Sequence, residues 1–237
     1  LFYYAFTNGS GQFTLNNLKN FFVDPNTMGT LCYSIVLAVT VTLVCLVIAY
    51  PVAYILAGSA LKRKGVILML FVLPMWINFT LRITALKEIL SLIEGNLAFH
   101  PFLNTVIGMT YDFLPFMILP LYTVIMKIDN RLIEAALDLG CRPSQVFSKV
   151  ILPLSGPGIL SGLTMVFVPA VSTFYISQKL GSTGTTLIGD VIESQFKTAY
   201  NPNLGAAMSL VLMILIFICV AIMNRFGEGD GEEVIKV

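Results

Sequence analysis

Five long apolar runs constrain this chain more than any other feature of its sequence. They cover residues 31–56, 66 to about 81, 103–126, 154–176 and 204–223. About 20 apolar residues are enough to span a bilayer as a helix. Because backbone polar groups in lipid must be paired within their own segment, we expect each run to be helical. The second run is short, and we expect its helix to continue through Arg82 to Leu90.

The composition agrees with a chain that lies mostly in a membrane. Of its 237 residues, 57% are hydrophobic and only 11% are charged, whereas a soluble domain carries about 25% charged residues. The net charge of +1 argues against a nucleic-acid partner, and the four cysteines lack the spacing of metal ligands. We therefore expect an all-α polytopic membrane protein with one domain over residues 1–237. We expect no catalytic cluster, no metal and no cofactor.

Basic residues in the short loops predict the orientation of the helices. The loops on one side carry nine of them, namely Lys62, Arg63, Lys64, Lys127, Arg131, Arg142, Lys149, Arg225 and Lys236. The loops on the other side carry five, namely Lys19, Arg82, Lys87, Lys179 and Lys197. The positive-inside rule places the first set in the cytoplasm. The one cytoplasmic loop of real size then covers residues 127–153.

This cytoplasmic loop is predicted to contain a short amphipathic helix. Asp129 or Asn130 suits its N-cap, and Gly140 is a typical residue just after a C-cap. One apolar stripe runs along it, formed by Leu132, Ala135, Ala136 and Leu139. Pro143 suits the first turn of a second short helix. Periodicity alone leaves two alternatives, a pair of helices that docks in a groove of a partner or a helix that lies on the membrane surface.

The same loop resembles a motif of the permeases of ABC importers. The family pattern is Glu-Ala-Ala, three residues, Gly, nine residues and Ile-x-Leu-Pro. This chain has Glu134-Ala135-Ala136, then Gly140, then Val150-Ile151-Leu152-Pro153, with Val150 in place of the first Ile. The resemblance implies that the loop forms coupling helices that contact an ATPase subunit. It assigns four residues to that contact, namely Glu134, Ala135, Ala136 and Gly140.

Further motifs resemble the branch of this family that transports spermidine and putrescine. They include Leu73-Pro74, Trp76, Asn78, Arg82, Leu86-Lys87 and residues 114–117, 120–122, 169–170, 174–177, 187–190 and 205–207. The resemblance implies a MetI-like permease fold of six helices, the first mostly missing from this chain. It implies a cell-membrane protein that imports polyamines by alternating access. Its implied partners are two ATPase subunits that handle the ATP, a second permease, an external polyamine-binding protein and membrane lipid.

Two other functions remain open for such a chain. A permease of the same importer class for another small solute is the main alternative. A secondary transporter is the weaker one, because such proteins usually carry intramembrane acids and internal repeats. This sequence has one intramembrane acid and no visible repeat.

Asp112 is the only Asp, Glu, Lys, Arg or His well inside an apolar run. It lies roughly 13 Å from the outer end of its helix, at about 1.5 Å per residue. A carboxylate at that depth is costly, which makes it a candidate for contact with substrate. Pro115 and Pro120 remove backbone donors nearby, so we expect a loosened helix of the kind found at transport sites. The alternative is a structural Asp held by a Tyr hydroxyl or a backbone donor.

Aromatic and acidic residues toward the outer side complete the candidate substrate pathway. The rings of Trp76, Tyr111, Phe174 and Tyr175 offer faces that attract ammonium groups. Asp190 and Glu193, in the outer loop before the last run, are candidates to meet a cation or the delivering protein. The alternatives are that these rings pack in the interior or the membrane interface, and that the acids are solvated.

One glycine pair in the fourth run predicts close helix packing. Gly158 and Gly162 form a GxxxG step. Small residues at this spacing let two helix backbones approach each other in a membrane. We expect a second helix to lie against this face.

Overall fold

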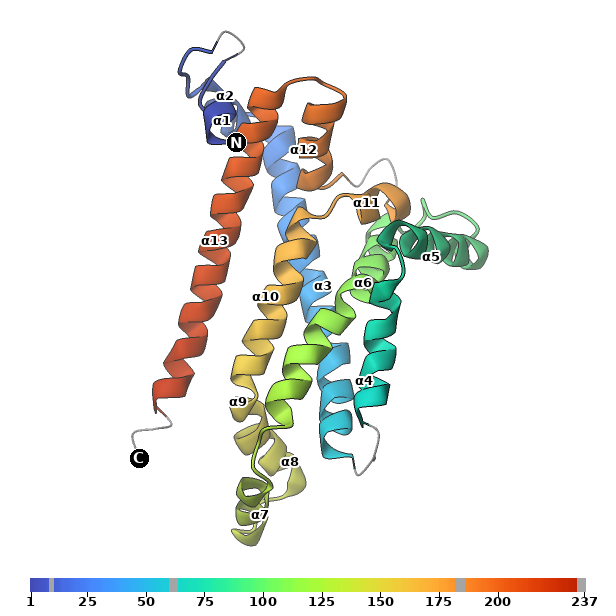
Figure 1. The fold of residues 1–237 in the computed structure, drawn as a ribbon, viewed down its shortest axis with the longest axis vertical. Coiled ribbons are helices and arrows are strands. Elements are labelled where there is room, and N and C mark those ends of the chain that lie inside the picture. Colours follow the sequence, from blue (N-terminus) through green and yellow to red (C-terminus); the bar gives the residue numbers. More distant parts are fainter. Residues whose placement is uncertain (9–10, 60–63, 182–185, 234–237) are drawn as a thin grey trace. The chain divides into compact units, whose positions relative to one another are not determined.

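The computed structural model describes residues 1–8, 11–59, 64–181 and 186–233, with side chains up to residue 225. Lys62, Arg63 and Lys236 of the predicted basic side lie outside the described side chains. The described chain is helical, and its one strand-like pairing is an isolated bridge between Thr7 and Phe13 (Figure 1). The expectation of an all-α protein is confirmed.

The chain forms two compact units. Unit 1 comprises Leu1–Val41, Asn78–Tyr111 and Phe167–Cys219, and unit 2 comprises Thr42–Ile77, Asp112–Val166 and Val220–Val237. Four long helices contribute to both units, namely α3 (Pro25–Gly58), α6 (Pro101–Ile125), α10 (Gly156–Ser172) and α13 (Pro202–Glu233).

The apolar runs form the helices that are suited to a membrane. Among the described residues, three helices are long and apolar enough to span it alone: Pro25–Gly58, Pro101–Ile125 and Pro202–Arg225. Two bent pairs raise the possible number to five, Lys64–Trp76 with Phe79–Glu94 and Pro143–Leu154 with Gly156–Ser172. These five correspond to the five predicted runs. Their outward side chains remain apolar, as in Val47, which is 71% exposed.

The second run does not continue as one helix to Leu90, which corrects the expectation. Helix α4 (Lys64–Val72) passes into a short 3₁₀ helix, η1 (Leu73–Trp76), and the helix then ends. Ile77 is extended, with φ −78° and ψ 142°. Asn78 starts a new helix, α5 (Phe79–Glu94), because its side chain accepts a hydrogen bond from the Thr80 N–H at 2.9 Å. An N-cap inside an apolar run changes hydropathy little, so the run alone does not reveal the break.

Helix α6 is also more regular than expected. It passes Pro115 and Pro120 as one continuous helix, so the predicted loosening does not break it. A proline removes one backbone donor but keeps a helical φ. Within a membrane bundle, neighbouring groups can satisfy the carbonyl that is freed. The helix is therefore not broken beside Asp112, whereas the second apolar run is interrupted at Ile77.

In unit 1, short helices pack around the ends of the long ones. They are α1 (Phe2–Ala5), α2 (Asn16–Val23), α11 (Tyr175–Leu180) and α12 (Ile188–Lys197). The Ile188 N–H donates to Ser34 Oγ at 2.8 Å, which fixes the start of α12 on α3. A Cβ on Gly189 would lie only 2.8 Å from the carbonyl oxygen of Thr173. The start of α12 therefore lies directly against the backbone that follows α10.

In unit 2, α10 packs tightly on α6, as the GxxxG step predicts. A Cβ on Gly158 would lie 2.9 Å from Val124 Cβ, and one on Gly162 would lie 2.5 Å from Met117 Sδ. Both distances are shorter than a normal van der Waals contact. Glycine at these two positions is what allows the two helices to approach.

Candidate functional site

Helix α7 (Asn130–Asp138) begins and ends where the sequence predicts. The Asp129 side chain caps it by accepting from the Arg131 N–H at 3.0 Å. Gly140 follows the helix with φ +85°, in the left-handed region. There the Gly140 N–H donates to the Leu137 carbonyl at 2.9 Å, and the Cys141 N–H donates to the Ala136 carbonyl at 3.1 Å. These two bonds form the glycine-dependent turn that satisfies the last carbonyls of a helix.

Most of the side chains of α7 are exposed, and none is buried. Leu132 is 50% exposed and Leu139 is 85% exposed. Glu134 and Ala135 are exposed as well, and Ala136 is half-buried. Exposed apolar side chains grouped on one short helix mark a surface that contacts a protein or a membrane.

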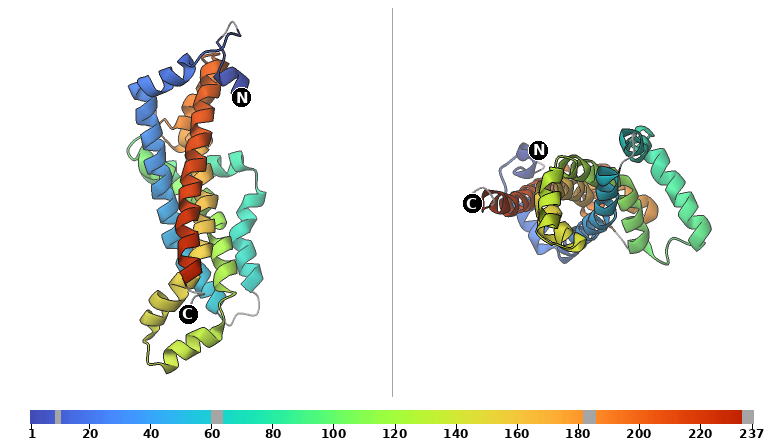
Figure 2. Two further views of the ribbon diagram at one scale, coloured as in Figure 1. Left: turned by 90° about the vertical axis from the view of Figure 1, so that its left-hand side faces the viewer. Right: turned by 90° about the horizontal axis from the view of Figure 1, so that it is seen from below.

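A second short helix follows α7 at an angle (Figure 2). Helix α8 (Pro143–Val146) begins at Pro143, as predicted, and the Gln145 side chain accepts from the Arg142 N–H at 2.8 Å. The chain continues as a π-helix, η2 (Phe147–Ile151), then as α9 (Leu152–Leu154), and bends by 61° into α10. The wider π turn lies just before Pro153, whose ring nitrogen has no hydrogen to donate.

Helix α3 holds this segment inside unit 2. The rings of Tyr50 and Tyr54 contact the Phe147 ring edge to face, with centroids 5.7 and 5.4 Å away. The Tyr50 hydroxyl lies 2.9 Å from Ser155 Oγ, and Ser155 donates its own hydrogen to the Leu152 carbonyl. Tyr50 is therefore the donor of the pair. These contacts were not predicted from the sequence, because no local pattern connects positions so far apart.

In unit 1, Asp190 lies between α11 and α12. Its Oδ2 accepts from Ser177 Oγ at 2.7 Å and from the Leu187 N–H at 2.8 Å. Its Oδ1 is buried and has no hydrogen-bond partner within the described part of the chain. Burial raises the pKa of Asp190 above its ordinary value, and the nearby charge of Glu193 adds to this. The hydrogen bonds from Ser177 and Leu187 and the nearby amide of Gln178 oppose the rise in the pKa.

Glu193, one turn further along α12, already has a cationic partner. Lys197 Nζ lies 2.6 Å from its carboxylate, and Gln178 Nε2 donates to the other oxygen at 2.5 Å. The hydrogen bond from Lys197 is the main reason that the pKa of Glu193 is lowered. Glu193 and Phe174 also line a cavity of about 660 Å³, whose other walls are mostly apolar residues of α10, α12 and α13.

Two of the predicted aromatic faces carry cations of the chain itself. The Arg82 guanidinium carbon lies 5.8 Å from the centre of the Tyr111 ring, and Lys179 Nζ lies 5.6 Å from that of Tyr175. Neither pair was predicted from the sequence. The fourth apolar run extends to residue 176, whereas α10 ends at Ser172 and α11 starts at Tyr175. The spacing of four residues between Tyr175 and Lys179 on α11 was the available signal.

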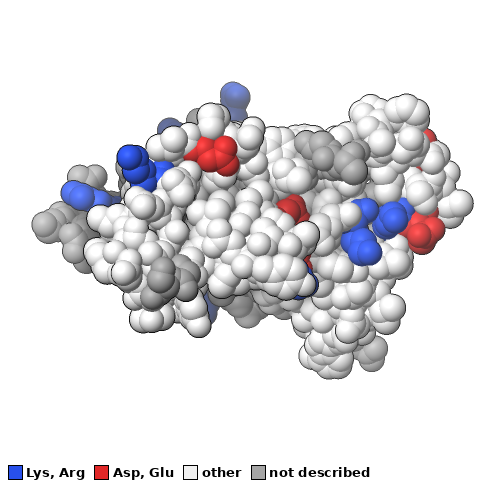
Figure 3. All heavy atoms as spheres, turned by 90° about the horizontal axis from the view of Figure 1, so that it is seen from above, with Lys and Arg blue, Asp and Glu red and all other residues white. Residues whose placement is uncertain are grey.

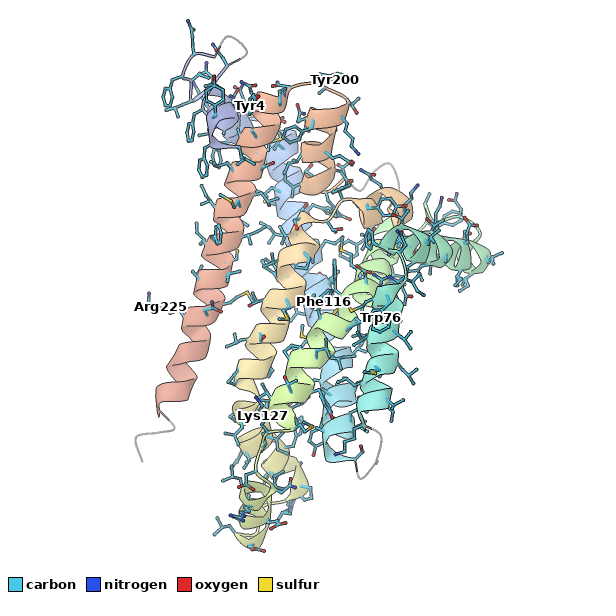
Figure 4. The ribbon with its side chains drawn as sticks, viewed as in Figure 1. Tyr4, Trp76, Phe116, Lys127, Tyr200 and Arg225 are labelled. Carbon is cyan, nitrogen blue, oxygen red and sulfur yellow. The ribbon has the colours of Figure 1, made fainter. Side chains whose placement is uncertain are left out.

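The remaining predicted residues, Asp112 and Trp76, belong to unit 2. Asp112 lies in the middle of α6, is only 5% exposed and interacts with other residues of the protein. Trp76 ends η1 with 84% of its surface exposed (Figure 4).

In unit 1 the structure brings together Asp190 with Ser177, and Phe174 with Glu193. Seen from above, charged side chains are few among uncharged atoms (Figure 3). The described residues contain no group of three or more potential metal ligands.

Solved structures share this fold. The methionine ABC transporter MetNI in an inward-facing conformation matches with a TM-score of 0.69 and 19% identity, over 86% of this chain and 95% of that one. A bacterial ABC transporter involved in the import of alginate matches with a TM-score of 0.69 and 15% identity, over 95% of this chain and 86% of that one. The predicted MetI-like permease fold is confirmed.

Several known permeases are more similar to this chain in sequence than these solved structures are. The spermidine/putrescine transport system permease protein PotB of Haemophilus influenzae is 38% identical over 94% of this chain and 81% of its own length. PotB of Escherichia coli is 38% identical over 86% of this chain and 79% of its own length. The inner membrane ABC transporter permease protein YdcU of Escherichia coli is 29% identical over 93% of this chain and 78% of its own length.

The sequence model of one protein family covers most of the chain. It describes the inner membrane component of binding-protein-dependent transport systems, and it matches residues 49–228. This range contains α7, the turn at Gly140 and the segment that follows them. The apolar helices agree with its location in the inner membrane. The chain belongs to the family of binding-protein-dependent transport system inner membrane components.

Proposed function

We propose that this chain is the transmembrane permease subunit of an ATP-driven importer of polyamines such as spermidine and putrescine. Its partners are a second permease, two ATPase subunits and an external polyamine-binding protein. The identity of 38% to PotB permeases supports the substrate class. The role in coupling to the ATPase rests on one observation, which is that α7 is a capped helix with exposed apolar side chains.

Helix α7 contacts the ATPase in this proposal. Burial of a leucine side chain contributes about 1.5 to 3 kcal/mol, so Leu139, which is 85% exposed, supplies a large part of the contact. The small Ala135 and Ala136 let a partner approach the helix backbone. Glu134 is exposed beside them and offers a carboxylate to a basic residue of the partner. The turn at Gly140 sets the angle at which α8 leaves.

In this proposal, the contacts inside unit 2 couple the ATPase to alternating access. ATP binding closes the two ATPase subunits, and α7 moves with the subunit on which it docks. The motion passes through α8 and η2, and the Phe147 ring and Ser155 transmit it to α3 by their contacts with Tyr50. The helices respond by opening toward the outside. The chain itself binds no nucleotide in this scheme.

Polyamines carry several ammonium groups at neutral pH, and the candidate pathway offers groups that bind them. Asp190 and Glu193 supply carboxylates in unit 1, and Asp112 supplies a buried one in unit 2. The rings of Tyr111, Phe174 and Tyr175 in unit 1 and of Trp76 in unit 2 supply faces that attract cations. We propose these seven residues as the substrate pathway.

Co-purification tests the coupling role. The permease pair is co-expressed with the ATPase, and the ATPase bound per permease is measured for Leu139→Ala and for a matched control, Leu92→Ala. Leu92 on α5 is 86% exposed, so both variants remove equally exposed leucines. We expect Leu139→Ala to weaken ATPase binding about tenfold, as for a central interface residue, and Leu92→Ala to leave it unchanged. Equal ATPase binding by Leu139→Ala and the wild type would rule out α7 as the contact.

A further inference from the structure

A cluster of rings and cations joins three helices at one place in unit 1. Phe79 and Arg82 lie one turn apart on α5. The Phe79 ring contacts the ring of Tyr175 on α11, with centroids 5.5 Å apart, and Arg82 lies over the ring of Tyr111 on α6. Lys179, one turn after Tyr175 on α11, places its ammonium 5.6 Å from the centre of the Tyr175 ring.

The two cations of this cluster differ in how firmly they are held. Arg82 is half-buried and its Nε is fully buried. Lys179 is exposed and lies in the last turn of a six-residue helix. A lysine side chain is a flexible chain of four carbons that ends in a strongly hydrated ammonium group. Lys179 is therefore the cation of the cluster that can leave its ring at little cost.

The chemistry of Lys179 is that of a polyamine end. Its side chain is a primary ammonium on an alkyl chain, and so is each terminus of putrescine or spermidine. A ring face that attracts one attracts the other by the same electrostatic interaction. A single face cannot hold both, because each ammonium needs the space above the centre of the ring. The Phe79 ring also contacts the Tyr175 ring, with centroids 5.5 Å apart.

We propose that Lys179 is a built-in competitor that occupies the substrate's ammonium position on Tyr175. The inference rests on the proposed polyamine function. An incoming polyamine displaces the Lys179 ammonium before its own end reaches the ring. The displacement lowers the affinity of the permease for free polyamine, and Lys179 takes the face again as the substrate leaves. Tyr175 is then a substrate-contacting residue, and Lys179 sets the apparent affinity without contacting the bound substrate.

Binding of labelled spermidine to the assembled transporter tests this proposal. The complex is held in lipid nanodiscs with a non-hydrolysable ATP analogue and without the binding protein. Lys179→Met removes the ammonium and keeps an unbranched side chain, and Lys179→Arg keeps a cation. Lys19→Met, on α2, removes an exposed lysine of the same unit that makes no cation–π contact among the described residues. Import of spermidine by the complete system with ATP is measured in parallel.

We expect Lys179→Met to lower the dissociation constant of spermidine about two- to fivefold, the size of an exposed cation–π contact. Lys179→Arg and Lys19→Met are expected to match the wild type. An unchanged or higher dissociation constant for Lys179→Met would overturn the competitor role, and so would an equal decrease in Lys19→Met. If the wild type imports spermidine but binds none under these conditions, the competitor role fails while the proposed function stands. If the wild type imports no spermidine, the proposed function itself fails.

Discussion

The Tyr50 hydroxyl on α3 donates a hydrogen bond to Ser155 Oγ, 2.9 Å away, across 105 residues of sequence. Ser155 is fully buried and Tyr50 is 9% exposed. The bond therefore lies out of contact with water, where a lost partner is costly. It fixes the end of the segment that begins with α7 to a membrane-spanning helix of the same unit.

Tyr50→Phe removes this hydrogen bond and keeps the ring contact with Phe147. We expect the free energy of unfolding to fall by about 0.6 to 1.5 kcal/mol, the range for one such bond in a membrane protein. Tyr54→Phe is the matched control, because Tyr54 contacts the same Phe147 ring. Denaturant unfolding of both variants in detergent measures the difference. Equal stability of the two variants would show that the Tyr50 hydroxyl contributes nothing.

Gly140→Val tests the turn that ends α7. The position has φ +85°, and no other group lies within 4 Å of an added Cβ, so the cost is one of backbone conformation alone. A left-handed conformation costs an L-residue roughly 1 to 2 kcal/mol, which reduces the population of the native turn about 5- to 30-fold. We expect ATPase stimulation by the loaded binding protein to fall accordingly. Gly140→Asn, a residue that tolerates this conformation, should retain most of it.

Gly158→Ala tests the packing of α10 on α6. The new methyl group would lie 2.9 Å from Val124 Cβ and 3.1 Å from the Pro120 carbonyl oxygen. Overpacking of this kind typically costs about 1 to 3 kcal/mol, so we expect a lower melting temperature of the assembled complex. Gly156→Ala on the same helix is the control, because its methyl group meets nothing within 4 Å. A melting temperature of Gly158→Ala as high as that of Gly156→Ala would contradict the packing described.

Asp190→Asn tests the buried carboxylate of unit 1. Because burial raises the pKa of Asp190 in the folded state, the folded chain favours the protonated acid. The stability that protonation contributes is complete below the ordinary pKa of 3.8 and is lost as the pH rises through the folded-state pKa. The quantity to compare is the melting temperature of Asp190→Asn minus that of the wild type. We expect this difference to be larger at pH 7 than at pH 4. If this difference in melting temperature is constant or smaller at pH 7, the buried carboxylate of Asp190 does not destabilise the folded chain.

The sequence predicted the parts of the fold that depend on short-range patterns. Helix α7 begins after Asp129 and ends before Gly140, because an N-cap side chain and a left-handed glycine act within one helical turn. The start of α8 at Pro143 follows from the same kind of local rule. The contact of Gly158 and Gly162 with α6 follows from residue size and spacing.

The remainder depends on contacts between distant positions or on small signals within apolar segments. Residues 66–90 are apolar enough to suggest one helix, and only Pro74 and Asn78 mark its interruption. The bond of Tyr50 to Ser155 has no local signature. The sequence makes the ring of Tyr175 a candidate face for an ammonium group, and in the structure the ammonium of Lys179 lies over that ring. Such an occupant becomes visible only when the helix that carries both residues is known.

Uptake of labelled spermidine into proteoliposomes tests the central claim most directly. The vesicles contain this permease, its partner permease and the ATPase, with the polyamine-binding protein outside and ATP inside. We expect spermidine to accumulate only when ATP, the ATPase and the binding protein are all present, with putrescine competing and a methionine control not competing. No ATP-dependent uptake of either polyamine by the fully assembled system, or uptake that proceeds without the ATPase, would contradict the assignment.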